Sequence, residues 1–167
     1  MKTMLMTAVT AAAMVVCVPG AGANALDAHW LKADAQANVS EIGAAKWMLG
    51  QTDNADVRAL AKRLIRDHTK ALHADQSLAR SVNIKLVLAP TPQATWNLRE
   101  LRKEVALGDV DKAYTLLMVA DHRMNIQAAK EEAAGGNVAP VVAAARASLP
   151  VLQTHLAMAK RTLSHLT

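Results

Sequence analysis

The chain has 167 residues and a formal net charge of +5, and 52% of its residues are hydrophobic although it has no phenylalanine. Its positive charges are spread along the chain without aromatic partners for base stacking, so we expect no nucleic-acid partner. Its one cysteine, Cys17, lies in the amino-terminal apolar run. The rest of the chain therefore has no disulfide, thiolate metal site, covalent haem c or cysteine nucleophile.

Residues 1–25 have the pattern of a cleavable signal peptide. Lys2 precedes an uncharged apolar run over residues 5–18, which a Pro-Gly step ends. The small residues that follow suit signal peptidase, and cleavage is predicted after Ala23 or Ala25. The run is too short to span a bilayer comfortably, so we expect no transmembrane segment after signal removal. The expected product is a periplasmic protein.

Two helical stretches begin the expected single domain, which covers residues 26–167. They span about 26–49 and about 56–81, where apolar residues recur at steps of three and four. Gly50 and the polar residues after it separate the two stretches, and an Asn or Asp before the second can cap it. Because the connection is short, we expect an antiparallel hairpin.

An extended connection over residues 83–92 follows, and then a short amphipathic helix over about 93–106. The next long helix is predicted to run from a cap at Asp109 or Asp111 to about Ala134. Its inward-facing stripe is predicted to hold Tyr114, Leu117, Asp121, Met124 and Ala128.

A Gly-Gly-Asn break at residues 135–137 precedes the last helix, which is predicted over about 139–166. Pro150 lies inside this helix and should kink it or split it. The short break predicts a second antiparallel hairpin, and the segment between the hairpins is long enough to cross the bundle. We therefore predict an all-α fold: a ferritin-like four-helix bundle of two helical hairpins with a long crossover carrying a short extra helix.

Four segments carry a resemblance to a known family: VSEIGAAKW, VRALAKRLIRDHTKAL, GDVDKAYTLLMVADHRMNIQAAKEEA and ASLPVLQTHLAMAKRTL. In their order and spacing, over residues 26–163, they resemble the bacterial exported family called domain of unknown function 4142 (DUF4142), which is grouped with ferritin-like proteins. The resemblance implies a periplasmic or envelope-associated helical bundle linked to envelope stress, and it implies no established activity. The family usually has an aromatic-acid pair after the second Asp-His step, where this chain has Ala129-Lys130.

One ionisable side chain lies near the middle of each long helix: Glu41, His68, His122 and His155. In a bundle of helices of similar length, mid-length positions fall at similar heights, so the four side chains can meet in one layer. Three imidazoles and one carboxylate suit one divalent transition-metal ion: zinc, copper, iron or manganese. The sequence thus contains a candidate metal site.

Four more residues are predicted to support this layer: Asp67, Asp121, Met118 and Met158. Each Asp directly precedes a histidine, about 100° round the helix, so it is better placed to contact an adjacent helix than its own histidine. The two methionines lie about one turn from a histidine. A thioether ligand would favour copper, although core packing is the simpler role for them.

A polar clamp is the alternative to a metal site, because buried carboxylate–histidine pairs can tie helices together without an ion. On sequence grounds alone the clamp is favoured. A ferritin-like di-iron centre needs a Glu-x-x-His motif on each of two helices. The chain has none, so we expect no di-iron centre.

The chain has no G-x-S-x-G motif, and we predict no catalytic residue. The favoured interpretation is a non-enzymatic exported helical bundle of unknown activity, for which metal binding and a stress-related role are candidates. Two alternatives stay open. One is a metal-dependent redox or detoxifying enzyme that uses the Glu/His layer, and the other is an interaction module that docks a partner protein of the cell envelope.

Overall fold

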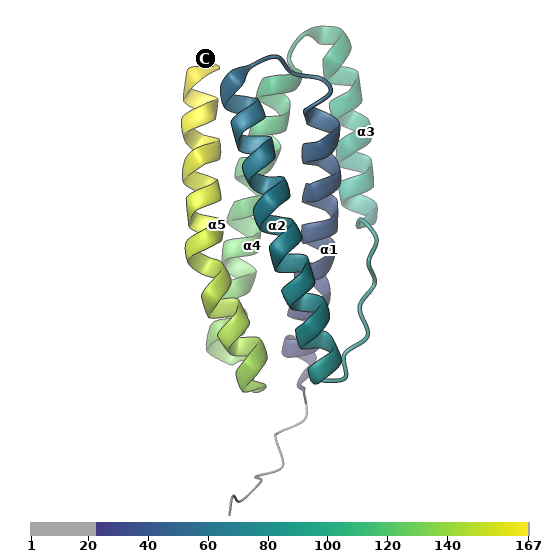
Figure 1. Ribbon diagram of the computed structural model, residues 1–167, viewed down its shortest axis with the longest axis vertical. Helices are drawn as coiled ribbons and strands as arrows, with labels where there is room; N and C mark the ends of the chain where they lie inside the picture. Colours follow the sequence, from purple (N-terminus) through teal and green to yellow (C-terminus); the bar gives the residue numbers. More distant parts are fainter. Residues whose placement is uncertain (1–22, 167) are drawn as a thin grey trace, which may run out of the picture.

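The computed structural model describes residues 23–166, and all regular structure in this range is helical. Four long helices stand side by side, and a shorter helix packs on the outside of the bundle (Figure 1). The helices are α1 Ala25–Met48, α2 Ala55–Ser81, α3 Pro92–Leu107, α4 Val110–Gly135 and α5 Ala139–His165. The predicted signal sequence lies outside the described residues as far as residue 22.

The two hairpins and the crossover have the predicted connectivity. Short turns join α1 to α2 and α4 to α5, and these two pairs make the most extensive contacts in the bundle. Residues 82–109 run back along the bundle and include α3, which contacts α4 and α1, so α2 and α4 point in the same direction (Figure 1). The ferritin-like four-helix arrangement is confirmed.

Helix boundaries follow from local chemistry at most ends. The Asn54 side chain accepts hydrogen bonds from the first backbone N–H groups of α2, and Thr91 does the same for α3. Gly108 ends α3 at φ 78°, a left-handed conformation that favours glycine. The prediction of a side-chain cap on α4 is wrong. Asp109 precedes α4, but its φ of −105° and ψ of 11° lie outside the extended region that a capping side chain needs, and it makes no cap hydrogen bond.

The buried face of α4 is rotated relative to the predicted stripe. Met124 is 64% exposed, and Asp121 is only partly buried. The residues that α4 buries are Val110, Tyr114, Thr115, Met118, Val119, His122, Ile126, Ala129 and Glu132. Because α4 contacts α1 and α5 and also α3, apolar residues occur on more than one of its faces. Periodicity alone therefore does not identify the face that points into the bundle.

Helix α5 is continuous through Pro150, so the predicted split does not occur. Pro150 lies on the exposed face of the helix. The backbone carbonyl that loses its intrahelical partner there can be hydrated, which makes a proline at this position tolerable.

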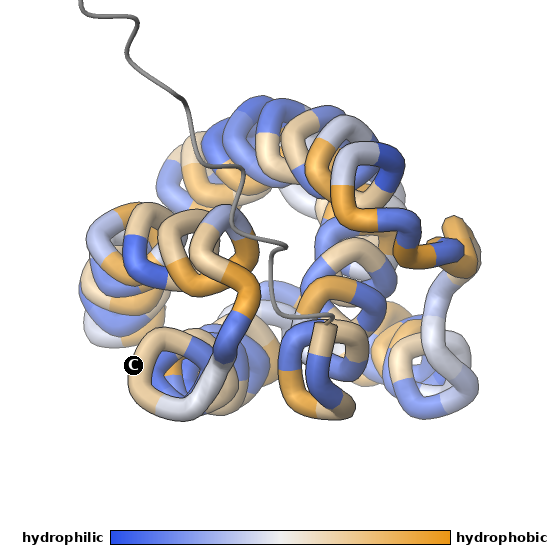
Figure 2. Tube along the Cα trace, turned by 90° about the horizontal axis from the view of Figure 1, so that it is seen from below, coloured by the Kyte–Doolittle hydropathy of each residue, from blue (hydrophilic) through white to orange (hydrophobic). Residues whose placement is uncertain are grey.

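Two apolar clusters fill opposite ends of the bundle. One holds Leu60, Leu64 and Tyr114 with their neighbours, and the other holds Leu31 and Val141 with theirs. Figure 2 looks along the bundle and shows hydrophilic and hydrophobic residues alternating around each helix. Between the clusters lies a buried layer of polar side chains. None of the helices in residues 23–166 is both long and apolar enough to cross a membrane.

Candidate metal centre

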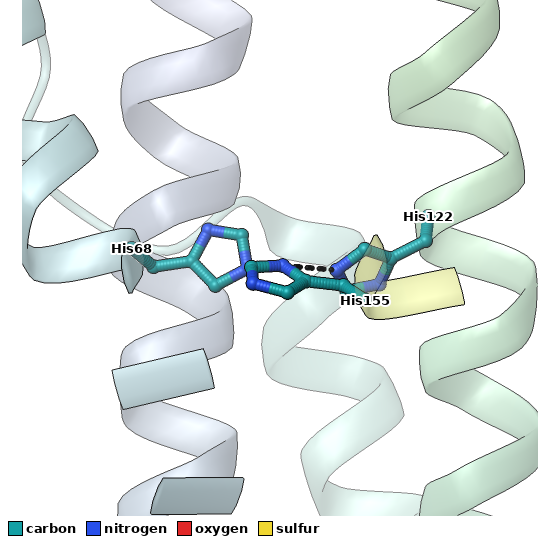
Figure 3. Close-up of side chains that lie close together, drawn as sticks. All are labelled: His68, His122 and His155. Atoms are coloured by element: carbon teal, nitrogen blue, oxygen red, sulfur yellow. Dashed lines mark hydrogen bonds between the residues drawn. The ribbon is translucent and has the colours of Figure 1, made fainter. Parts of the chain in front are cut away.

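The structure brings the four mid-helix residues together in the polar layer. Glu41 comes from α1, His68 from α2, His122 from α4 and His155 from α5. All four are buried, with exposed fractions of 3% for Glu41 and His68 and 0% for His122 and His155. Figure 3 shows the three imidazole rings pointing toward one another from three helices. One ring nitrogen from each lies within 4.8 Å of the other two.

The outward-facing nitrogen of His68 is bound by an amide. Nδ1 of His68 lies 2.7 Å from Oδ1 of Asn38. Nδ2 of Asn38 donates to Asp75 across 2.8 Å and to Asp34 across 3.3 Å. The two carboxyl groups require the NH₂ group on their side, so the amide oxygen faces the imidazole. Nδ1 of His68 therefore carries the proton, and in the neutral ring Nε2 is unprotonated.

The other two imidazoles are held in the same way. Nδ1 of His122 donates to the backbone carbonyl of Met118 across 2.9 Å. Nε2 of His155 donates to the Asp67 carboxylate on α2 across 3.0 Å. Each histidine thus has one nitrogen bound to an acceptor outside the layer. The remaining nitrogens, Nε2 of His122 and Nδ1 of His155, carry lone pairs when the rings are neutral, so the hydrogen bond between them forms only when one of the two rings takes up a second proton.

These lone-pair nitrogens and the Glu41 carboxylate converge. Nε2 of His122 lies 3.2 Å from Nδ1 of His155 and 3.4 Å from Oε2 of Glu41. The same Glu41 oxygen lies 2.9 Å from Nε2 of His68, but the two atoms do not have hydrogen-bond geometry. Both are buried without a hydrogen-bond partner among the described residues. Such atoms are costly to bury unless a proton or a cation satisfies them.

The electrostatics of the layer keep Glu41 ionised. Burial would raise the pKa of Glu41, but the neighbouring charges of His68 and His122 outweigh it and hold the pKa at about 2. Burial lowers the pKa of His68, but the negative charge of Glu41 reverses this and raises it above its ordinary value. Burial, together with the charges of His68 and His122, lowers the pKa of His155 to about 4. Without a cation, the layer therefore favours a protonated His68 beside an ionised Glu41.

Asp67 contacts the histidine of a neighbouring helix, as the sequence predicts for it. Its carboxylate accepts from His155 and also from Arg63 and Arg66 on its own helix. Burial would raise the pKa of Asp67, but these hydrogen bonds hold it well below its ordinary range. An ionised Asp67 can only accept, which fixes the proton on Nε2 of His155.

The other three supporting residues differ in what they touch. Met118 meets the layer through its backbone carbonyl, the acceptor for His122. Met158 is partly buried against the apolar cluster around Leu60. Asp121 lines a cavity of about 210 Å³ between α1, α3 and α4 that also reaches Glu41 and Met118. Burial, and then the charge of Glu41, raise the pKa of Asp121 to about 7. The cavity is the candidate entry path to the layer.

Sequence reasoning missed two amides that position the layer. Asn38 orients His68, and Asn125 donates from Nδ2 to Oε1 of Glu41 across 2.9 Å. The signal for Asn38 was its position, one turn before Glu41 on the same helix face. The signal for Asn125 was weaker, because it lies one turn after Asp121 and three residues after His122, on a helix whose buried face was predicted incorrectly.

Comparisons with known proteins place the fold and the family. The chain is similar to a solved structure titled as a DUF305 fragment from Deinococcus radiodurans, with a TM-score of 0.70 and 14% identity, covering 87% of this chain and 99% of that one. At that identity the likeness concerns the fold alone. The comparison with curated proteins gives no match. The family model described as a domain of unknown function, DUF4142, matches residues 18–162. The chain therefore belongs to the DUF4142 family.

Proposed function

We propose that this protein binds one divalent transition-metal ion in the layer formed by Glu41, His68, His122 and His155, and that it acts as an exported metal-binding protein. The observation that carries the proposal is the set of outer hydrogen bonds. An acceptor holds the outer nitrogen of each histidine, in Asn38, Met118 and Asp67. Metal-binding histidines almost always have such partners, which orient the ring and make the inner nitrogen a better ligand.

Three of the six distances between the inner atoms lie near the edge length of a tetrahedral site. With metal–ligand distances of about 2.0–2.1 Å, the ligand atoms of a tetrahedral site lie roughly 3.3 Å apart. The contacts of His122 with His155 and Glu41 measure 3.2 and 3.4 Å, and that of His68 with Glu41 measures 2.9 Å. One ring nitrogen of each histidine lies within 4.8 Å of the other two, so binding would draw the imidazoles together until all of these distances reach the tetrahedral value.

Three imidazoles and one carboxylate are a donor set for zinc or copper, with iron or manganese as weaker competitors. We infer zinc as the preferred ion, because the four donors are buried and three of their six mutual distances lie near those of a tetrahedral site. Copper binds such sites more tightly in general, so availability would decide between the two. Met118 and Met158 have no described contact through sulfur with Glu41 or the three histidines. We therefore propose no thioether ligand.

The closed arrangement favours binding over catalysis. Structural metal sites fill all positions with protein ligands, whereas catalytic sites keep one position for water or substrate. Here one ring nitrogen of each of the three imidazoles lies within 4.8 Å of the other two, the Glu41 carboxylate lies beside His68 and His122, and all four side chains are buried. We therefore retain the non-enzymatic interpretation. The periplasmic location stays part of the proposal, supported by the apolar amino-terminal run and the small residues after it.

Metal stoichiometry of the purified protein tests the proposal. We expect close to one equivalent of zinc or copper by elemental analysis, removed by a chelator and restored by titration. His68→Ala and His122→Ala should lose that equivalent. His73→Ala is the matched control, because His73 lies on the same helix as His68 but is exposed. A folded wild-type protein that takes up no zinc, copper, iron or manganese would leave the polar clamp as the function of the layer.

A further inference from the structure

A second buried acidic group lies at the end of the bundle where α1 begins. Asp27 of α1 and Glu132 of α4 are both fully buried, with exposed fractions of 0%, and their carboxyl groups lie side by side. Asp27 has hydrogen-bond partners for both oxygens. Oδ1 accepts from the backbone N–H groups of Asn137 and Val138, at 3.1 and 3.0 Å, and Oδ2 accepts from that of Asn24 at 2.9 Å.

Glu132 lacks such partners. Both of its carboxyl oxygens are buried without a hydrogen-bond partner among the described residues. Its side chain folds over Gly136, where an added Cβ would lie 2.1 Å from Oε1. Burial, and then the neighbouring carboxyl group of Asp27, raise the pKa of Glu132 to about 7. A nearby positive charge would remove the cost of burying two acids together.

No side chain in the described part of the chain supplies that charge. Among residues 23–166, no Lys, Arg or His forms an ion pair with Asp27 or Glu132. The nearby Arg146 of α5 donates to the backbone carbonyl of Ala133 instead, across 3.0 Å. The backbone nitrogen of Asn24, which donates to Asp27, would become a cation if the chain were cleaved directly before it.

The nitrogen of Asn24 has more acceptors than an amide can use. It lies 2.9 Å from Oδ2 of Asp27 and 3.1 Å from Oδ1 of Asn137. An amide has one hydrogen to share between the two, whereas an ammonium group has three. Asn24 directly follows Ala23, one of the two predicted cleavage positions, and Ala23 is exposed. Cleavage at the other position, after Ala25, would delete Asn24 and the capping box that it forms with Asp27.

We propose that the leader is cleaved between Ala23 and Asn24 and that the new α-ammonium group of Asn24 binds in the Asp27–Glu132 carboxylate site. Cleavage is a hydrolysis by an endopeptidase that accepts small residues at Ala21 and Ala23. Water adds its oxygen to the carbonyl carbon of Ala23, which leaves as a carboxylate, and the amine of Asn24 is released and protonated. The ammonium group then donates to Asp27, to Asn137 and toward Glu132. The inference rests on the proposed signal sequence and is independent of the metal site.

The first test is the amino terminus of the protein purified after expression and export of the full-length chain. Intact mass and amino-terminal sequencing should give Asn24 as the first residue. A mature chain that begins at Leu26 or at any other residue would overturn the proposal.

The second test compares chains that begin at Asn24 and at Ala23, each made with a fusion partner that is removed without leaving residues. We expect the Asn24 form to melt roughly 3–6 °C higher. The α-amine of the Asn24 form should also react several-fold more slowly with an acetylating reagent. Glu132→Gln should abolish the difference in Tm, whereas Glu131→Gln, at an exposed neighbouring position, should keep it. If Glu132→Gln does not fold, the reactivity of the two unsubstituted forms decides. Equal Tm and equal reactivity would contradict amine binding.

Discussion

Nε2 of His155 donates to the carboxylate of Asp67 across 3.0 Å between α5 and α2. The acid that directly precedes His68 in the sequence therefore orients the histidine of another helix. Nε2 of His155 carries the proton that it donates to Asp67. The Nδ1 atom of His155 is therefore left as an acceptor that faces His122. This pairing links two helices and at the same time prepares a metal ligand.

Asp67→Asn should weaken metal binding without removing any proposed ligand. The amide can donate to Nε2 of His155. This favours the tautomer that carries its proton on Nδ1, so that Nδ1 can no longer bind the metal. Loss of such a partner typically lowers affinity about 10–100-fold. Competition with a chromophoric chelator measures the change. Asp53→Asn, at an exposed position, is the control and should bind as the wild type does. Unchanged affinity in Asp67→Asn would show that its hydrogen bond has no role in binding.

Metal should stabilise the wild-type protein against heat. At a free metal concentration 100 times Kd, binding adds about 2.7 kcal/mol to the free energy of unfolding. For a domain of this size that corresponds to a rise in Tm of roughly 5–10 °C. Circular dichroism melts with and without zinc measure it. His122→Ala should show no rise, and a rise of equal size in that variant would place the bound ion elsewhere.

Asn38→Leu should destabilise the protein in the absence of metal. The change keeps a side chain of similar size, but it removes the acceptor for Nδ1 of His68 and the donor to Asp75. Leaving such buried groups unpaired should cost about 2–4 kcal/mol in the free energy of unfolding, measured by urea denaturation. Gln36→Leu, on the same helix but partly exposed, is the comparison and should cost less than about 1 kcal/mol. An equal loss in the free energy of unfolding from the two changes would argue against a stabilising role for the hydrogen bonds of Asn38 with His68 and Asp75.

Stability should fall as pH rises toward 8, in part because of Asp75. Burial, and then the charge of Asp34, raise the pKa of Asp75 from its ordinary 3.8 to about 8 in the folded protein. Because the pKa of Asp75 is raised in the folded state, protonation of Asp75 stabilises the protein. This contribution to the free energy of unfolding is full below pH 3.8 and is lost as pH rises through about 8. Asp75→Asn imitates the protonated carboxyl, so its Tm should fall less between pH 5 and 8.5 than that of the wild type. Parallel pH profiles would contradict the assignment.

Tyr114→Phe should keep or increase stability. The Tyr114 ring is fully buried, and its hydroxyl has no hydrogen-bond partner among the described residues. Removing the unpaired oxygen takes away a desolvation penalty of about 1 kcal/mol, at the expense of a small cavity. Chemical denaturation measures the change in the free energy of unfolding. A loss of more than about 1 kcal/mol would indicate that a water molecule or another group satisfies the hydroxyl.

Helix positions, the crossover and the heights of Glu41, His68, His122 and His155 could be predicted because they depend on local patterns. Apolar periodicity and breaking residues define each helix, and similar helix lengths place mid-helix residues in one layer. The rotation of α4 could not be predicted, because apolar residues on several of its faces fit the periodicity equally well. The continuity of α5 through Pro150 depended on that residue facing solvent.

Apolar spacing and breaking residues were enough to predict an all-helical bundle in which each long helix has one ionisable residue at mid-length. The partners across helices became visible in the packed bundle: Asp67 with His155, Asn38 with His68, and Asp27 with Glu132. The difference arises from the distance along the sequence over which each determinant acts. Helix propensity and amphipathic spacing act within a few residues, whereas partners across helices depend on how each helix is rotated and shifted against its neighbours. The partner of each imidazole determines which ring nitrogen carries the proton. The chemistry of the layer therefore depends on how the bundle packs.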